Sequence, residues 1–415
     1  MLERKRGEVS SDPAVREALA EIPSAWDWRN VEGHNWVSPV RDQNPWGSCA
    51  AFSAIASLET LLKRHAGDPN LDVDLSERFL FAYGGGDSAI GWWLSQAADF
   101  LKTIGTVPEA LCPYEAWDGV PPTDSVTPYL ASGGILIQDW RPIIEGYFYK
   151  DENTVKQAVM ESPVIAWMEL YTDFAAYTGG VYDHVREGEV YAGNHFVLLI
   201  GWDDAQDAWI CKNSWGTAWG EGGFFRIKKS SKGNCFFPGY TYQLIYGETS
   251  GARGRVGRDA PAVMPDGASA NFKCPVRGLL NHQSPTIEVL LTHQRTSDIF
   301  LTLTSPRGIS SPVLAGRQGS HPDFPGLFLN DGNAWTVTEL LTNRDYPGID
   351  LGFNRGCARP DAPMTPLMAG GAVGEWTLSA ADNITGEQGS LDAWSLIFIA
   401  DPAPASADPA HWSRY

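Results

Sequence analysis

The segment around Cys49 is the most informative part of this sequence. Gly47 and Ser48 immediately precede the thiol, and Gln43 lies shortly upstream. Residues 50–65 then repeat apolar side chains at helical spacing, so a helix is expected to begin here, with Ser48 as its capping residue. Backbone N–H groups at a helix N-terminus favour a thiolate over a thiol. We therefore predict a reactive nucleophile rather than a buried core cysteine, which is the usual state of a free thiol.

A histidine and an asparagine further along the chain suit the same chemistry. His195 begins a short apolar run that is typical of a buried strand, and Asn213 lies between that strand region and the next. An imidazole beside the sulfur would take its proton and give a thiolate–imidazolium pair. The Asn213 amide would hold the ring in one tautomer, while Gln43 and the Cys49 backbone N–H would stabilise an oxyanion. Each residue alone also fits a purely structural role.

Residues 22–246 resemble the papain family of cysteine peptidases. Five segments in the family's order carry the resemblance: Ile22-Pro23-Ser24-Ala25-Trp26-Asp27-Trp28-Arg29, Val37-Ser38-Pro39-Val40-Arg41-Asp42-Gln43, Leu75-Ser76-Glu77, Asn194-His195 and Asn213-Ser214-Trp215-Gly216. A cysteine followed roughly 130–150 residues later by the histidine is also the family's spacing. The resemblance implies a two-lobed α+β domain, with Cys49 in a helical lobe and His195 and Asn213 in a β-barrel-like lobe. It also implies a protein or peptide substrate, catalysis without a cofactor, and Trp215 as a cover over the His195–Asn213 hydrogen bond.

Several positions depart from the family's pattern. Trp46 stands where the family usually has a disulfide-forming cysteine, and the partner region around residues 83–87 has no cysteine either. Phe196 replaces a small residue at the floor of the main specificity pocket and is expected to shrink or block it. The glycines that pair with substrate backbone in the family have two candidates here, Gly91 and the run at residues 84–86. These departures favour, as an alternative, a narrow processing peptidase or a peptide ligase with the same machinery.

A second domain is expected over residues 272–400. Short strands separated by turn residues predict an antiparallel β-sandwich in this region. The segments at residues 291–308 and 374–396 resemble the P domain of subtilisin-type proprotein convertases, which implies a jelly-roll-like sandwich. Cys274 and Cys357 are its two cysteines and a candidate pair.

The same domain holds three candidate metal ligands. Asp298, Asp382 and Asp392 offer the hard oxygen atoms that calcium prefers, and structural calcium is therefore a candidate cofactor. The alternative is that these aspartates cap turns.

The remaining segments are assigned by composition. Residues 1–21 are expected to be an N-terminal extension or a propeptide remnant, without the apolar core of a secretory signal. Residues 247–271 are rich in Gly, Ala, Pro and Arg and read as a linker, and residues 401–415 as a flexible tail. The appended sandwich favours export, whereas the missing signal and missing disulfide positions favour an intracellular enzyme. Export is the expectation, and an intracellular location is the alternative.

Length and charge narrow the functional classes. The 415 residues suit two domains, and 43% hydrophobic with 20% charged residues is ordinary for a globular protein. A net charge of −19 argues against nucleic-acid binding, and no apolar run is long enough to span a bilayer. We expect a monomeric cysteine peptidase. A catalytically silent binding protein is the rival from another class, but it has no chemical need for the full set of Gln43, Cys49, His195 and Asn213.

Overall fold

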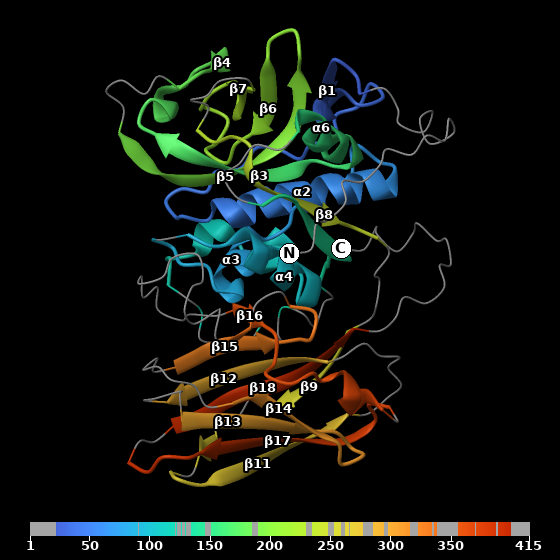
Figure 1. Cartoon of the computed structure of the whole chain (residues 1–415), viewed down its shortest axis with the longest axis vertical. Coiled ribbons are helices and arrows are strands. Elements are labelled where there is room, and N and C mark those ends of the chain that lie inside the picture. Colours follow the sequence, from blue (N-terminus) through green and yellow to red (C-terminus); the bar gives the residue numbers. More distant parts are fainter. Residues whose placement is uncertain are drawn as a thin grey trace, which may run out of the picture.

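The computed structural model of the chain places a β lobe, a helical lobe and a β-sandwich one after another along its longest axis (Figure 1). It describes residues 22–89, 91–120, 122, 126, 129, 134–145, 151–184, 190–229, 235–247, 253–258, 262–264, 266–276, 285–293, 298–315, 323–333, 336–337, 356–369, 371–386 and 389–399. The predicted N-terminal extension at 1–21 and the predicted tail at 401–415 lie outside these residues.

The helical lobe is built on one long buried helix. Its helices are α2 (Cys49–Ala66), α3 (Glu77–Gly84) and α4 (Leu94–Thr103). The helix α2 is buried over most of its length, and its exposed last turn ends at Gly67. The φ of 65° at Gly67 is a left-handed conformation that glycine adopts without strain. Ser76 caps α3 by accepting a hydrogen bond from the Phe79 N–H at 2.9 Å. Cys49 thus becomes the first residue of a rigid, well-packed helix, as the sequence predicted.

The β lobe is a single sheet of eight strands with one helix against it. The elements are β1 (Ala25–Asp27), β2 (Asp139–Ile144), α6 (Glu152–Glu161), β3 (Val164–Tyr171), β4 (Val181–Tyr182), β5 (Tyr191–Asp203), β6 (Ala208–Lys212), β7 (Phe224–Lys228) and β8 (Gly239–Ile245). The strands run in the order β2-β8-β3-β5-β6-β7-β4, and β1 pairs with β5. The long strand β5 contacts α2 across the two lobes. It therefore carries His195 to the side of the sheet that faces Cys49's helix.

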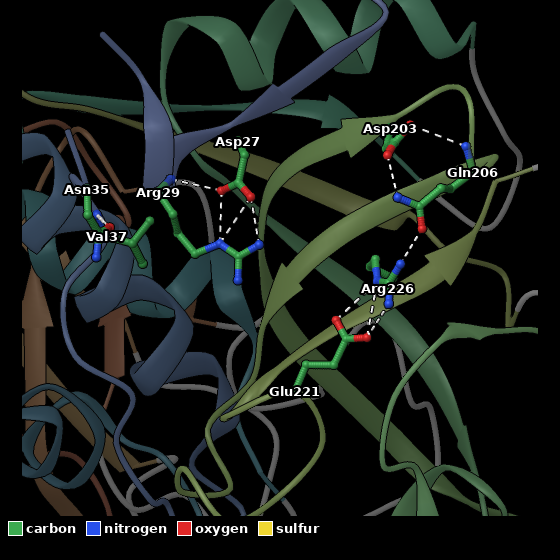
Figure 2. Close-up of polar contacts among 8 residues, drawn as sticks. All are labelled: Asp27, Arg29, Asn35, Val37, Asp203, Gln206, Glu221 and Arg226. Atoms are coloured by element: carbon green, nitrogen blue, oxygen red, sulfur yellow. Dashed lines mark hydrogen bonds and ion pairs between the residues drawn. The ribbon is translucent and has the colours of Figure 1, made fainter. Parts of the chain in front are cut away.

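The turn between β6 and β7 is held by charged side chains. Figure 2 shows Arg226 of β7 between the carboxylate of Glu221 and the side chain of Gln206. Glu221 also accepts a hydrogen bond from the Gly180 N–H at 3.0 Å. Burial alone would raise the pKa of Glu221, but its bonds to Arg226 and Gly180 lower it overall. The carboxylate therefore stays charged and fixes the segment that follows Asn213.

The C-terminal domain is a sandwich of two sheets. Its strands are β9 (Arg253–Arg258), β10 (Ala262–Met264), β11 (Ser269–Val276), β12 (Thr286–His293), β13 (Ile299–Thr304), β14 (Ser310–Leu314), β15 (Asp323–Leu329), β16 (Gly356–Ala358), β17 (Gly374–Asp382) and β18 (Gly389–Ile399). One sheet has the order β10-β18-β12-β15-β16 with β9 on β18, and the other has the order β11-β17-β13-β14. All described strand pairs of this sandwich are antiparallel except β15 with β16.

One expectation for this region needs correction. The segment at 247–271 was predicted as a linker, but it contains β9 and β10, which pair with β18, and the start of β11. Backbone pairing overrides its Gly- and Arg-rich composition. The sequence of the second domain also predicts a strand at 335–340, and most of that segment lies outside the described residues.

The expected pairing of cysteines is wrong as well. All six cysteines lie in the described part of the chain, and none forms a disulfide. Cys274 packs in the core of the sandwich, whereas Cys357 packs with the core of the catalytic domain.

The sandwich is joined to the helical lobe by buried contacts. Phe328 of β15 packs edge-on against Phe100 of α4, with ring centroids 5.4 Å apart. The Thr103 hydroxyl lies 3.6 Å from the Cys357 sulfur, and the buried Glu288 carboxylate accepts a hydrogen bond from the Val126 N–H at 3.2 Å. Phe328, Cys357 and Ile397 belong to the same apolar cluster as the helices. These three residues of the sandwich therefore share a core with the helical lobe, while the sandwich keeps a second apolar core of its own.

The shared core predicts that a single truncation in the sandwich destabilises the protein strongly. Phe328→Ala should lower the free energy of unfolding by about 3–5 kcal/mol, because it leaves a cavity against Phe100. Phe300→Ala, on the partly exposed side chain of β13, should cost about 1 kcal/mol or less. Urea unfolding followed by tryptophan fluorescence measures both. Equal losses in the two variants would contradict a shared core.

Candidate active site

Cys49 lies at the N-terminus of α2, where backbone N–H groups surround its sulfur. Burial raises the pKa of the thiol, while the N–H groups of Phe196, Ala50 and Cys49 itself oppose that rise by hydrogen bonding. Phe196 directly follows His195 on β5, so the structure brings the sulfur to the strand that carries the predicted base. The sequence analysis expected the helix N-terminus to favour a thiolate, but burial outweighs it for the thiol taken alone.

The histidine is held in one tautomer. The His195 Nε2 lies 2.7 Å from the Asn213 Oδ1, and that oxygen also accepts the Ser214 N–H at 2.8 Å. An amide oxygen only accepts hydrogen bonds, so Nε2 must carry a hydrogen. In the neutral ring Nδ1 is then the atom that can take a proton. Burial lowers the pKa of His195 to about 4, and the bond to Asn213 opposes this shift.

Aromatic side chains cover the imidazole. The ring centroids of His195 and Trp215 are 5.0 Å apart, with 31° between the ring planes. Trp215 in turn packs edge-on against Trp219 and Phe174 at 5.0 and 5.5 Å. Trp215 therefore lies where the sequence analysis expected a cover for the His195–Asn213 pair.

Gln43 is oriented by three hydrogen bonds. Its Oε1 accepts the Ser214 hydroxyl at 2.6 Å, its Nε2 donates to the Trp46 carbonyl at 3.0 Å, and its N–H donates to the Ser214 carbonyl at 2.8 Å. An amide NH₂ has two hydrogens, so one remains for a ligand. Ser214 thus holds both Gln43 and Asn213. Ser214 belongs to one of the five segments that resemble the papain family, but nothing in the sequence alone predicts this role for it.

Buried charges lie behind Asn213. Lys212 donates to the Ser38 hydroxyl at 3.0 Å, and burial lowers its pKa to about 8, opposed by Glu59 and Glu77. Burial also raises the pKa of both glutamates. Lys212, Glu59 and Glu77 line a small cavity together with Asn213. This cluster was not predicted from the sequence. The signal that could have revealed it is the presence of charged residues, Glu59 and Lys212, within an apolar helix and an apolar strand.

Of the residues expected to bind substrate, Phe196 lies where it could narrow a pocket, whereas Gly91 is engaged in its own loop. Phe196 is buried and pairs in register with Trp167 of β3, so two large rings lie side by side on neighbouring strands. Gly91 lies beside Gly47, but its N–H donates to the Asp87 carbonyl at 2.8 Å and its carbonyl accepts the Asp87 N–H at 3.1 Å. The Gly91 N–H is already engaged within its own loop, contrary to the expectation that it pairs with substrate.

The three candidate calcium ligands are not gathered into one set. Asp382 lies 3.5 Å from the His293 Nε2, and its main chain is in register with Ile299, next to Asp298. Asp392 instead accepts hydrogen bonds from Thr292 and Ser390. Within the described ranges, no group of three or more His, Cys, Asp or Glu side chains is arranged to hold a metal ion.

Comparisons with known proteins agree with this geometry. The family model described as "Papain family cysteine protease" matches residues 22–243, and that described as "Proprotein convertase P-domain" matches residues 283–398. The first match covers more than half of the sequence, and the chain belongs to the papain family of cysteine proteases. The described part of the chain has no helix long and apolar enough to cross a membrane.

Three curated relatives illustrate the similarity. Fruit bromelain of Ananas comosus is 32% identical over 227 residues, which is 52% of this chain and 59% of that protein. Macrodontain-1 of Ananas macrodontes is 33% identical over 50% of this chain and 90% of its own length. Cathepsin B-like CP3 of Giardia intestinalis is 32% identical over 54% of this chain and 75% of its own length.

The low pKa of His195 predicts an acid-sensitive stability in the Cys49→Ala variant. The pKa in the folded protein, about 4, lies below the ordinary 6.5, so the unfolded chain binds the proton first as the pH falls. The contribution of His195 is therefore complete above pH 6.5 and is lost toward pH 4, by up to about 3 kcal/mol.

The matched comparison is Cys49→Ala against Cys49→Ala with His195→Gln. Denaturant unfolding at pH 7 and pH 4 should show a smaller acid loss in the double variant, because glutamine does not titrate. An imidazole pKa near 6.5 by NMR in Cys49→Ala would contradict the prediction.

Proposed function

We propose that this chain hydrolyses peptide bonds with Cys49 as nucleophile and His195 as acid–base group. One observation carries the proposal: the His195–Asn213 hydrogen bond leaves Nδ1 as the proton acceptor, on the strand whose Phe196 N–H reaches the sulfur. Burial disfavours a lone thiolate and a lone imidazolium. A pair formed by proton transfer has no net charge and gains the attraction between its two ions.

The steps follow from these positions. The Cys49 sulfur passes its proton to His195 and attacks the substrate carbonyl carbon. The resulting oxyanion accepts hydrogen bonds from the Cys49 N–H and the remaining Gln43 Nε2 hydrogen. His195 then protonates the leaving amine, and a water molecule that His195 deprotonates releases the acid from the thioester.

The paired rings of Phe196 and Trp167 favour narrow specificity. Both side chains are buried, and Trp167 also packs edge-on against Tyr240 at 6.0 Å. Large groups on both strands leave little room for a bulky substrate side chain. This observation favours a processing peptidase of narrow specificity, and product masses would separate hydrolysis from peptide ligation.

The sandwich is assigned a stabilising role. Glu288 illustrates it, because the buried carboxylate accepts hydrogen bonds from Val126, outside the sandwich, and from Ser395 within it. A buried carboxylate with both oxygens bonded is costly to separate from its partners. We infer that the sandwich supports the helical lobe from the side opposite the β lobe.

The proposed nucleophile is tested by Cys49→Ala. Cleavage of a peptide library should fall to background, since no thiol remains to attack, and an epoxide-type thiol reagent should no longer label the protein. Cys211→Ala is the matched control, because this cysteine is fully buried on neighbouring β6. Its variant should keep both cleavage and labelling. Undiminished cleavage by Cys49→Ala would eliminate the proposal.

If Phe196 blocks the main specificity pocket, removing its ring should allow bulkier substrates to be cleaved. Phe196→Ala should increase kcat/KM about tenfold for peptides with a bulky apolar side chain two residues before the scissile bond. The reason is that this substrate side chain would be buried in the space that the Phe196 ring occupies. Library cleavage profiles with and without the substitution measure the change. A profile identical to that of the unmodified enzyme counts against the blocked pocket. Phe300→Leu, on β13 of the sandwich, is the control and should leave the profile unaltered.

A further inference from the structure

The hydroxyl of Ser48 is diverted from helix capping. Ser48 occupies the N-cap position of α2, and its carbonyl accepts the N–H groups of Ala51 and Phe52 at 2.9 and 3.2 Å. Its side chain makes no capping bond, contrary to the sequence-based expectation. The hydroxyl lies instead 2.7 Å from the Tyr114 hydroxyl. A cap bond typically stabilises a helix by about 1 kcal/mol, so this arrangement gives up a stabilising contact.

The direction of the hydrogen bonds can be assigned. Tyr114 Oη lies 2.5 Å from the Gln43 carbonyl, which can only accept, so the single phenolic hydrogen points to Gln43. Ser48 must then donate to Tyr114. The result is a chain of hydrogen bonds from Ser48 through Tyr114 to Gln43, buried throughout. We call it the Ser48–Tyr114–Gln43 chain.

This chain joins the two sources of oxyanion donors. At one end, the chain holds the main chain of Gln43, whose side-chain amide is one donor. At the other end, it holds Ser48, which directly precedes Cys49, whose N–H is the second donor. Residues 44–47 connect the two and are exposed or partly exposed. Resting on the proposed function, we propose that Tyr114 is a positioning residue of the oxyanion hole, which fixes the Gln43 amide relative to the Cys49 N–H.

Tyr114 is firmly seated for this role. Its N–H donates to the Glu109 carboxylate at 2.6 Å, and its ring packs edge-on against Phe52 of α2 at 4.8 Å. Trp117 also packs edge-on against this ring, with the ring centroids 6.0 Å apart. These contacts do not involve the hydroxyl. Tyr114→Phe therefore removes the chain and keeps the packing.

The test separates oxyanion stabilisation from the reactivity of the thiol. Alkylation of Cys49 by iodoacetamide needs the thiolate but forms no oxyanion, whereas peptide hydrolysis needs both. In Tyr114→Phe we expect kcat to fall about tenfold with KM within about twofold, because both donors remain but are misaligned. The alkylation rate should stay within about twofold of the unmodified enzyme.

Two further variants make the result decisive. Ser48→Ala cuts the other end of the chain without removing a cap bond and should lower kcat about threefold, and its effect should not add fully to Tyr114→Phe. Tyr177→Phe is the matched control, because that hydroxyl donates to the Gly180 carbonyl at 2.6 Å in the other lobe. It should leave kcat unaltered.

Three results would overturn the proposal. An unchanged kcat in Tyr114→Phe would do so, as would an equal fall in kcat and in alkylation rate, which marks a general structural role. If Tyr114→Phe does not fold, an unchanged kcat in Ser48→Ala overturns it. Turnover by the unmodified chain tests the proposed function separately, so the two failures can be told apart.

Discussion

The contact between the N-terminus of α2 and strand β5 is the constraint on which the catalytic site depends. It brings the Cys49 sulfur to the Phe196 N–H, and the neighbouring residue on that strand is His195. Both partners sit on elements buried on most sides, so neither can move far from the other. The eight-stranded sheet and the helical lobe can be understood as the support for this one contact, and the sandwich extends that support beneath α3 and α4.

Burial sets the electrostatic terms of the chemistry. It raises the pKa of the Cys49 thiol and lowers that of His195 to about 4, so each group alone is favoured neutral. Proton transfer within the pair changes no net charge, and the attraction between the two ions offsets part of the cost of burying each of them. The cluster of Lys212, Glu59 and Glu77 follows the same logic, because opposite charges are buried together behind Asn213.

Most of the helices and strands that could be predicted from the sequence were predicted from local patterns of apolar residues. The helix at Cys49, the strand at His195 and the sandwich strands at 286–293 and 299–304 have strong periodicity, and the structure contains them. The strands at 253–258 and 262–264 could not be recognised, because their pairing with β18 depends on residues far along the chain. The contacts of Ser48 and Ser214 were hidden for the same reason: a hydroxyl's partner is set by tertiary packing, not by its neighbours in sequence.

The loop before Cys49 shows how a missing cross-link can be replaced. Where the family usually has a disulfide, the Gly47 N–H donates to the Ser88 carbonyl at 2.9 Å, and Trp46 packs against Trp117 at 5.5 Å. A disulfide would fix one point, whereas these contacts and the Tyr114 hydroxyl hold the loop at several. Because each bond is individually weak, the geometry of the proposed oxyanion donors depends on their combination. On the proposal that Tyr114 positions these donors, the Ser48 hydroxyl contributes more to the site by bonding to Tyr114 than by capping α2.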